Sequence, residues 1–201
     1  IQFMQWLRLC GLSIVLLSLL VLGQSPRPIA SASGGTIDGF GMGSGTHLRV
    51  GRQGLEAAFA AQAEMGVRWN REDIPWSEVE PADGNFRWAY EFGDYPRDFD
   101  AALAEMEEHN IEMVALLDYG PNYLGEPTPD QLVSHWGDYV QAVVDKFGDR
   151  IDYWEIGNEM NSPEFWGKVV HPTQPDHKAE PDPELYTRML RVAHNVIKAH
   201  N

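Results

Sequence analysis

Residues 111–156 read IEMVALLDYGPNYLGEPTPDQLVSHWGDYVQAVVDKFGDRIDYWEI. The stretch begins with a nearly unbroken apolar run at residues 111–117, which is typical of a strand buried on both faces. Pro129 and Asp130 then open a helical segment that reaches about Phe147. A second short apolar run follows at residues 151–156. A strand, a helix and a strand in this order predict a β-α-β unit with parallel strands.

The same alternation continues on both sides of this unit. In the segment 97–110, Phe99, Leu103 and Met106 recur at three- and four-residue spacing, which indicates an amphipathic helix. Four β-α units in strict order predict an α/β fold with a parallel sheet and helical crossovers. The further strands are expected at residues 37–42 and 67–71, and the further helices at 53–65, at 97–110 and from 183 to the last residues.

Two parallel folds fit this order, an open doubly wound sheet and a closed eight-stranded barrel. The glycine-rich segment 39–45 lacks the spacing of a dinucleotide-binding turn, and we expect no helix directly after it. The long, aromatic-rich loops at residues 73–96, 118–128 and 160–183 all follow strands, whereas the loops that precede strands are short. Because barrel enzymes carry their active sites on the loops after the strands, this asymmetry favours a (β/α)8 TIM barrel.

The length of the chain limits how much of a barrel it can form. Its 201 residues are fewer than the roughly 250 of a complete barrel. We therefore expect residues 33–201 to be the N-terminal half of a barrel, truncated to about the first four β-α units.

The first 32 residues differ in character from the rest. Arg8 precedes an apolar run at residues 9–22, and Ala30-Ser31-Ala32 follows a polar stretch that contains prolines. A positive start, an apolar centre and a small-residue cleavage site together predict a secretory signal peptide at residues 1–32, cleaved after Ala32. The alternative is an uncleaved anchor helix, because the apolar run is close to the lower limit for spanning a bilayer. Cleavage is favoured, and it predicts a secreted or extracytoplasmic protein that no longer contacts the membrane.

Charge and cysteine content exclude several classes of partner. The chain has 15 Lys and Arg against 30 Asp and Glu, a net charge of -15. Such an acidic surface repels phosphate backbones, so we expect no nucleic-acid partner. The only cysteine, Cys10, lies in the predicted signal peptide, which leaves the mature chain without a cysteine-based metal site.

The predicted strand that begins at residue 151 leads into the motif Trp154-Glu155-Ile156-Gly157-Asn158-Glu159. This motif resembles the end of strand four in the clan-A glycoside hydrolases, which include family 5 cellulases and family 39 β-xylosidases. A second segment, Gly-Val-Arg-Trp-Asn-Arg at 66–71 followed by Trp76, Glu80-Pro81, Gly84 and Phe86, is similar to the strand-two signature of the clan. The resemblance covers about residues 36–200.

The resemblance implies a retaining O-glycosyl hydrolase that acts on a poly- or oligosaccharide without a cofactor. Retention needs an acid that protonates the leaving oxygen and a second carboxylate that attacks the anomeric carbon. By resemblance, Glu159 is the general acid/base and Asn158 contacts the sugar 2-hydroxyl. The nucleophile of the clan is a Glu on strand seven, which this chain does not include. Arg71 matches an arginine that supports that nucleophile, and it is equally a candidate to form an ion pair with Glu155, whose strand parity we expect to bury it.

Aromatic residues on the strand-end loops are candidate sugar-binding platforms, because flat rings stack on the C–H faces of sugars. Trp76, Tyr119 and Trp166 are the substrate-binding candidates carried forward, and Trp88 and Tyr123 lie on similar loops. The alternative for each is that it packs beneath its own loop. His47 lacks the His-x-His pattern of barrel metallohydrolases, so we expect no metal site.

Two other functions fit the same residues. One is a non-catalytic carbohydrate-binding barrel or inactive fragment that uses the same loops and aromatic residues. The other is an unrelated barrel enzyme, such as a metal hydrolase or an aldolase, in which Asn158-Glu159 is coincidental. That enzyme would need His or Lys at strand ends, and the four predicted strands supply neither.

Overall fold

A computed structural model of the chain describes residues 39–174, 176 and 178–200. The predicted signal peptide at residues 1–32, and the start of the predicted first strand at 37–38, lie outside the described residues. Within the described part of the chain, no helix combines the length and the apolar character needed to cross a membrane.

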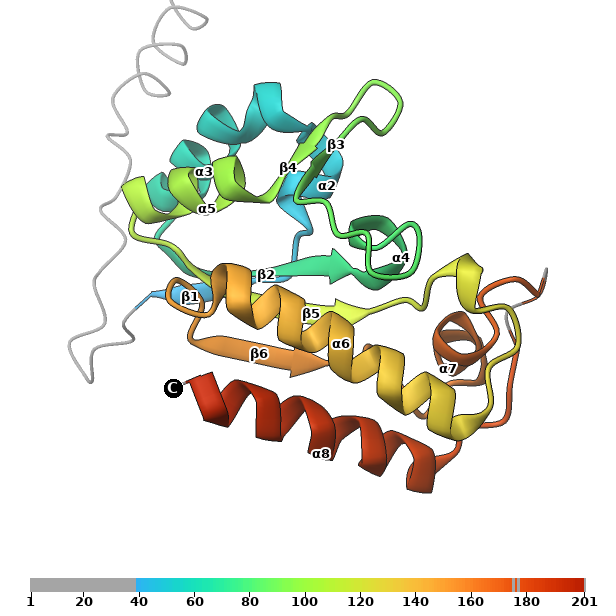
Figure 1. Cartoon of the computed structure of the whole chain (residues 1–201). Helices are drawn as coiled ribbons and strands as arrows, with labels where there is room; N and C mark the ends of the chain where they lie inside the picture. Colours follow the sequence, from blue (N-terminus) through green and yellow to red (C-terminus); the bar gives the residue numbers. More distant parts are fainter. Residues whose placement is uncertain (1–38, 175, 177, 201) are drawn as a thin grey trace, which may run out of the picture. The chain divides into compact units, whose positions relative to one another are not determined.

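Four parallel strands form the central sheet (Figure 1). They are β1 (Phe40–Met42), β2 (Val67–Pro75), β5 (Glu112–Asp118) and β6 (Tyr153–Ile156), and they lie side by side in the order β1-β2-β5-β6. This is the predicted α/β order of four β-α units, which the structure confirms. The sheet is not closed into a barrel, and β1 and β6 form its two edges.

Each strand is followed by a helix. The helices that return the chain are α3 (Leu55–Glu64), α5 (Phe99–Glu108), α6 (Pro129–Phe147) and α8 (Pro183–His200). Several short elements in the loops were not predicted, including one helix directly after the glycine-rich segment, where none was expected. They are α2 (Thr46–Val50), η1 (Arg52–Gly54), α4 (Trp76–Val79), the β3–β4 hairpin (Ala89–Tyr90 with Arg97–Asp98), η2 (Asn122–Leu124) and α7 (Pro163–Val170).

Helices α6 and α8 lie side by side along the sheet, and local sequence signals begin each of them (Figure 1). Thr128 and Gln131 form a capping box ahead of α6, which satisfies two backbone N–H groups that a helix start leaves free. The Asp182 side chain accepts a hydrogen bond from the Leu185 N–H at 2.9 Å at the start of α8. Between the helices, the Trp136 indole donates to the Met189 carbonyl at 3.1 Å.

Strand β2 runs beyond its predicted end at Arg71 because a buried carboxylate is satisfied there. Glu72 is fully buried. Its oxygens accept from the Thr46 and His47 backbone N–H groups at 2.7 and 3.2 Å, and they lie 2.6 Å from His47 Nδ1. The start of α2 therefore supplies the partners that a charge inside a strand requires.

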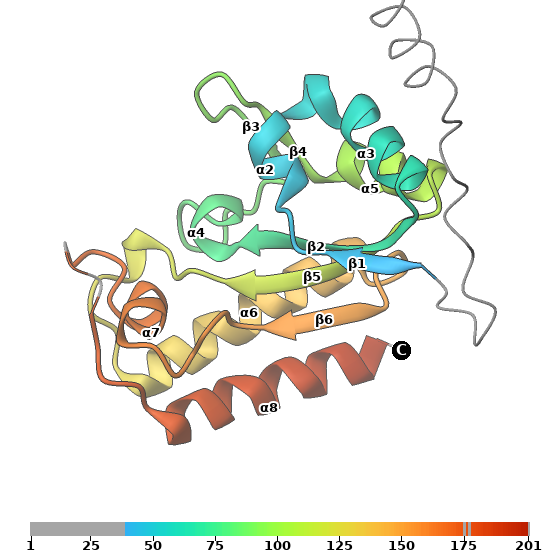
Figure 2. The same ribbon diagram turned by 180° about the vertical axis from the view of Figure 1, so that it is seen from behind.

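The two faces of the sheet are different. One face carries Ile74, Ala115 and Leu117, which are at most 1% exposed and pack in the core beneath the helices. Residues of the opposite parity, among them Arg71 and Glu155, point to the other face. No described helix covers that face, which is turned toward the viewer in Figure 2.

Candidate active site

The predicted functional residues lie where β2, β5 and β6 end. The three strands are parallel, so their carboxyl ends lie together at the same end of the sheet. The register places Pro75 beside Asp118 and Leu117 beside Ile156, which brings the loops after the three strands together. Ligand sites of parallel α/β folds lie at the carboxyl ends of the strands.

A guanidinium group connects β2 to β6. Arg71 Nε donates to Glu155 Oε2 at 2.6 Å and Nη2 donates to Glu155 Oε1 at 2.9 Å, which makes a bidentate pair. Nη2 also donates to Asn158 Oδ1 at 2.8 Å. Because this fork fits a carboxylate so well, one arginine fixes both the strand and the first residues of the loop after it.

The predicted Arg71–Glu155 ion pair is confirmed, but the predicted burial of Glu155 is wrong. The two side chains are 32% and 39% exposed, because no described element covers this face of the sheet. The hydrogen bond to Glu155 raises the pKa of Arg71, and the negative charge around it adds to this effect against the opposing effect of burial. The guanidinium therefore stays charged in the site.

The loop that carries Glu159 turns sharply after β6. The Gly157 N–H donates to the Leu117 carbonyl at 2.8 Å, which continues the ladder to β5. Gly157 and Glu159 both have positive φ angles, 72° and 48°. A left-handed conformation is uncommon for a glutamate, and residues held in such conformations cluster at functional sites. The turn leaves the Glu159 side chain exposed, while Asn158 is held by Arg71.

An open pocket of about 650 Å³ lies against Glu159. Apart from Glu159 itself and Asn161, its lining is mostly apolar. The lining residues are Gly157, Glu159, Met160, Asn161, Pro181, Pro183 and Tyr186. Glu159 thus lines a space that a ligand can enter.

We predict that Gly157→Ala destabilises the loop that holds Glu159. A Cβ at Gly157 would lie 2.4 Å from Met160 Sδ, and φ is +72°. Gly93→Ala is the matched control, because its φ is +56° but nothing lies within 4 Å of the added carbon. Each variant bears a left-handed penalty of about 1–2 kcal/mol, and only Gly157→Ala must also move Met160. Thermal unfolding should show the larger loss for Gly157→Ala, and equal losses would contradict this account.

Tyr119, the first residue after β5, is the only one of the three candidates carried forward that remains partly exposed. Its φ is +55°, and its carbonyl accepts from the Ser77 N–H at 2.9 Å. Burial raises the pKa of the Tyr119 phenol, and the charges of Asp118 and Asp73 raise it further. The phenol therefore remains a neutral hydrogen-bonding group next to the site.

Trp76 and Trp166 do not offer ring faces to a sugar, so their prediction as binding platforms is wrong. Trp76 is fully buried and stacks on Tyr139, with ring centroids 5.4 Å apart. Its indole N–H donates to Glu80 at 2.6 Å. Trp166 is 2% exposed, because α7 turns its apolar face into the core. Both rings are part of the packing beneath their loops, which was the alternative for each. Of the other aromatic candidates, Trp88 stacks on Phe86 at 6.0 Å and Tyr123 is partly buried.

Two carboxyl groups at the carboxyl ends of these strands were not among the predicted site residues. Asp118 ends β5 and is 1% exposed, and Asp73 lies near the end of β2. Burial and the charge of Asp73 raise the pKa of Asp118 to about 9. Burial also raises the pKa of Asp73, which Arg71 partly offsets. Asp118 and Asp73 both lie at or near the end of a strand that a loop region follows. That position was the signal available in the sequence, because active-site residues of barrels come from the strand ends.

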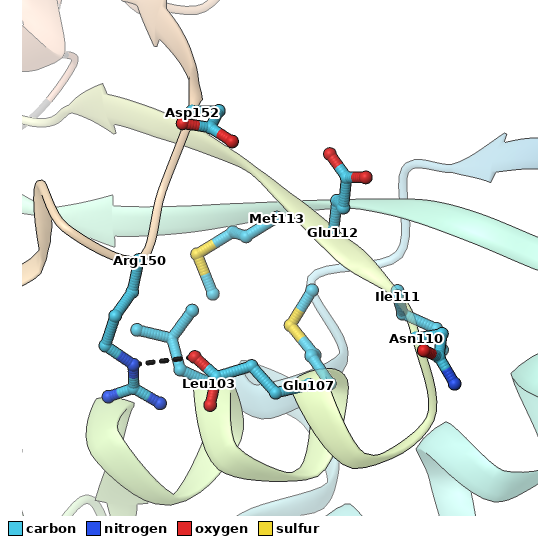
Figure 3. Close-up of a pocket in the computed structure, with 9 residues that line it drawn as sticks. Leu103, Glu107, Asn110, Ile111, Glu112, Met113, Arg150 and Asp152 are labelled. Atoms are coloured by element: carbon cyan, nitrogen blue, oxygen red, sulfur yellow. Dashed lines mark hydrogen bonds and ion pairs between the residues drawn. The ribbon is translucent and has the colours of Figure 1, made fainter. Parts of the chain in front are cut away.

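A second pocket, of about 270 Å³, lies at the other end of the strands from Glu159 (Figure 3). Arg150 Nε donates to Glu107 Oε1 at 2.7 Å across its rim, and Leu103 and Met113 are among its apolar lining residues. It is formed at the amino ends of β5 and β6. In barrels, residues at that end of the strands contribute to stability, whereas the active site lies at the carboxyl ends. Among the described residues, no group of three or more His, Cys, Asp or Glu side chains is placed to hold a metal ion.

No protein-family model matches the chain, and no curated protein matches its sequence. Solved structures resemble it in fold. A family 39 glycoside hydrolase from the gut symbiont Bacteroides cellulosilyticus WH2 aligns at 18% identity with a TM-score of 0.50, over 73% of this chain and 27% of that one. The beta-glycosidase BGL167 aligns at 18% identity and 0.54, over 75% and 43%. The AHE enzyme from Alicyclobacillus herbarius aligns at 17% and 0.51, over 75% and 34%.

These likenesses are structural, and they show the fold. The chain spans between 27% and 43% of the length of the three proteins. Its four β-α units therefore correspond to part of a fold that glycoside hydrolases use, as the resemblance of the sequence motifs predicted.

Proposed function

We propose that the protein is a retaining O-glycosyl hydrolase that acts on a poly- or oligosaccharide, with Glu159 as its general acid/base. One observation carries the proposal: the Asn158-Glu159 pair lies at the carboxyl end of β6, with Asn158 held by Arg71 and Glu159 exposed on a pocket. The fold likeness to a family 39 glycoside hydrolase and to a beta-glycosidase supports the class of reaction.

The geometry suits the first half of a two-carboxylate mechanism. Glu159 in its acid form would donate its proton to the glycosidic oxygen as the bond to the anomeric carbon breaks. Asn158 would hydrogen-bond the 2-hydroxyl through its amide N–H₂, because its carbonyl oxygen is already occupied by Arg71. That contact strengthens as the sugar approaches the oxocarbenium-like transition state. Glu159 would then act as the base that activates the water of the second step.

The second carboxylate belongs to the proposal through the resemblance alone. A retaining enzyme holds its nucleophile about 5–5.5 Å from the acid, and the clan carries it on strand seven. Glu155 is bound at both oxygens by Arg71 and is therefore assigned a structural role. Activity is accordingly proposed for the complete protein.

Export is proposed on the residues of the N-terminus. The apolar run at 9–22 and Ala30-Ser31-Ala32 predict removal of residues 1–32. The mass of the exported protein tests this, since cleavage after Ala32 leaves Ser33 as the first residue. An exported protein that retains the apolar run would instead support the anchor.

The test of the proposed function uses the full reading frame that encodes these residues, expressed beside the 201-residue chain. Both are assayed on a panel of nitrophenyl glycosides and polysaccharides, and the anomeric configuration of the first product is followed by NMR. We expect the complete protein to hydrolyse at least one glycoside with net retention. Inversion would contradict the mechanism, and saturable sugar binding without hydrolysis would replace it by the carbohydrate-binding barrel.

A further inference from the structure

The β3–β4 hairpin, residues 89–98, carries aromatic side chains in two different environments. Tyr90, at its base, is 8% exposed, packs near Phe99 with ring centroids 6.3 Å apart, and donates a hydrogen bond to Glu78. Phe92 and Tyr95, at its tip, are 50% and 48% exposed. Single exposed rings are common on proteins, but two in one short loop form a patch, and exposed patches mark interaction sites.

A tight turn brings Phe92 and Tyr95 close together. The Tyr95 N–H donates to the Phe92 carbonyl at 3.0 Å, and Gly93 between them has a φ of 56°. The first and last Cα atoms of such a β-turn lie less than about 7 Å apart. The two aromatic side chains therefore start from neighbouring positions at the tip of the hairpin.

The tip is fixed against the segment that precedes α3. The Arg52 N–H donates to the Pro96 carbonyl at 2.8 Å. Gly51 lies so close that a Cβ added to it would be 2.9 Å from the Tyr95 Cα. Binding groups that are held in place before a ligand arrives lose little entropy when it binds. The hairpin thus presents its two rings on a fixed support.

The Phe92 ring is also held by a buried cation. Arg97 is 6% exposed, and its guanidinium lies over the Phe92 ring, 5.1 Å from the centroid. This cation–π contact steadies the ring although half of the side chain remains open to solvent. Glu91 and Asp94 lie beside the two rings in the same loop, and both are exposed. The tip therefore combines flat apolar rings with carboxylate oxygens.

This combination suits a neutral chain of sugars. Flat rings stack on the C–H faces of sugars, and carboxylates accept hydrogen bonds from hydroxyl groups. The two acids and the net charge of -15 repel anionic partners. Two side chains are also few for a stable protein interface, which needs about 20–30 residues on each side.

The hairpin follows β2, and its tip points in the same direction as the arrowheads of β2 and β5 (Figures 1 and 2). It lies beside α2, on the far side of β2 from β6 and the loop that carries Glu159. Active sites of barrels lie at the end to which the strands point. A ligand that reaches both the hairpin and Glu159 must therefore be a polymer.

We propose that Phe92 and Tyr95 form a second carbohydrate-binding surface, which holds a neutral polysaccharide chain apart from Glu159. Its role in supplying substrate rests on the proposed function, and it narrows the substrate class to polymers. Binding at the hairpin is itself independent of hydrolysis, and it is tested without it.

The test is native electrophoresis of the full-length protein in gels that contain xylan, glucomannan or hydroxyethylcellulose. Every protein carries Glu159→Gln, so that the polymer stays intact. We expect at least one polymer to retard the protein. Phe92→Ser and Tyr95→Ser should each lower the affinity by about 5–10-fold, and the two together by more than about 30-fold. Tyr95→Phe keeps the ring and should keep the retardation.

Phe40→Ser is the matched control. Phe40 is 47% exposed, and it lies at the amino end of β1, away from the hairpin. Its replacement removes an exposed ring of the same kind and should leave the affinity for each polymer unchanged. Thermal unfolding shows that every variant is folded.

Salt and oligomeric state identify the occupant. Retardation by a neutral chain should persist between about 0.05 and about 0.5 M NaCl, because stacking on a ring is not screened. Retardation that salt abolishes would overturn the proposal in favour of a charged ligand. A dimer that Phe92→Ser and Tyr95→Ser convert to a monomer, as measured by light scattering, would overturn it in favour of a second copy of the chain.

The proposal is also overturned if no polymer retards the protein, or if the double variant binds as tightly as the parent. These results are separate from those that bear on the proposed function. Loss of binding in the double variant, in a protein that hydrolyses no glycoside, would refute the hydrolase and leave the hairpin surface in place. Unchanged binding in an active hydrolase would refute only the hairpin surface.

Discussion

Replacing Glu159 with glutamine is expected to reduce kcat/KM on unactivated glycosides by about 10²–10⁴-fold, the usual contribution of a general acid. Glutamine keeps the shape and the hydrogen-bonding capacity of the side chain, but it cannot transfer a proton. The loss should appear in turnover more than in stability, because the Glu159 side chain is exposed and makes no described hydrogen bond. The measurement is steady-state kinetics of the complete protein on its best natural substrate.

Glu164→Gln is the matched control for this experiment. Glu164 lies five residues further on in α7, is exposed, and pairs with Lys168 at 3.0 Å. Removing that pair should change stability by less than about 1 kcal/mol and leave turnover within a factor of two or so of the wild type. Comparable losses in the two variants would mean that Glu159 contributes through the loop and not through its proton.

The second large effect is on stability, and it comes from Asp118. We expect Asp118→Asn to be more stable than the wild type at neutral and alkaline pH, with a gain that grows as the pH rises. The pKa of Asp118 is raised from 3.8 to about 9 in the folded protein. The folded state therefore holds a proton that the unfolded state releases, and the unfolding free energy falls by up to about 1.4 kcal/mol per pH unit through this window.

The unfolding free energy of the wild type should fall with rising pH relative to that of Asp118→Asn. The contribution of the protonated group is fully present below pH 3.8 and is lost as the pH rises through about 9. The asparagine variant has no proton to lose. Unfolding free energies of both proteins should agree near pH 4 and differ by roughly 4 kcal/mol near pH 7, as measured by denaturant titration. Parallel curves across this range would show that Asp118 is ionised in the folded protein.

The main elements of the fold could be predicted because their signals are local. The apolar run of β5, the proline and aspartate at the start of α6, and the spacing of Phe99, Leu103 and Met106 each specify one element without reference to the rest of the chain. The short elements α4 and α7 were missed because four or eight residues within a loop show too little periodicity. The extension of β2 through Glu72 was missed for another reason: its partners, Thr46 and His47, are contributed by a distant segment.

In the candidate site, too, some features could be predicted from the sequence and others could not. Strand parity indicated that Glu155 points to the same face as Glu159, and an arginine such as Arg71 was the expected partner for a carboxylate there, which the structure shows. Burial cannot be read from one side chain alone, however, so Trp76 was taken for a platform although it stacks on Tyr139 inside the molecule. Asp118 was overlooked because in the sequence it directly follows the apolar run at residues 111–117, and it resembles an ordinary loop residue until its surroundings are known.

The most direct test of Glu159 as the acid/base is to vary the leaving group of the substrate. A nitrophenolate departs without a proton, whereas a sugar or methanol needs one, so only the second kind depends on a general acid. We would compare kcat/KM of the complete wild-type protein and Glu159→Gln on matched glycosides of both kinds. The account predicts a loss for the poor leaving group that exceeds the loss for the activated one by about 100-fold or more. Equal losses on both substrates would contradict it.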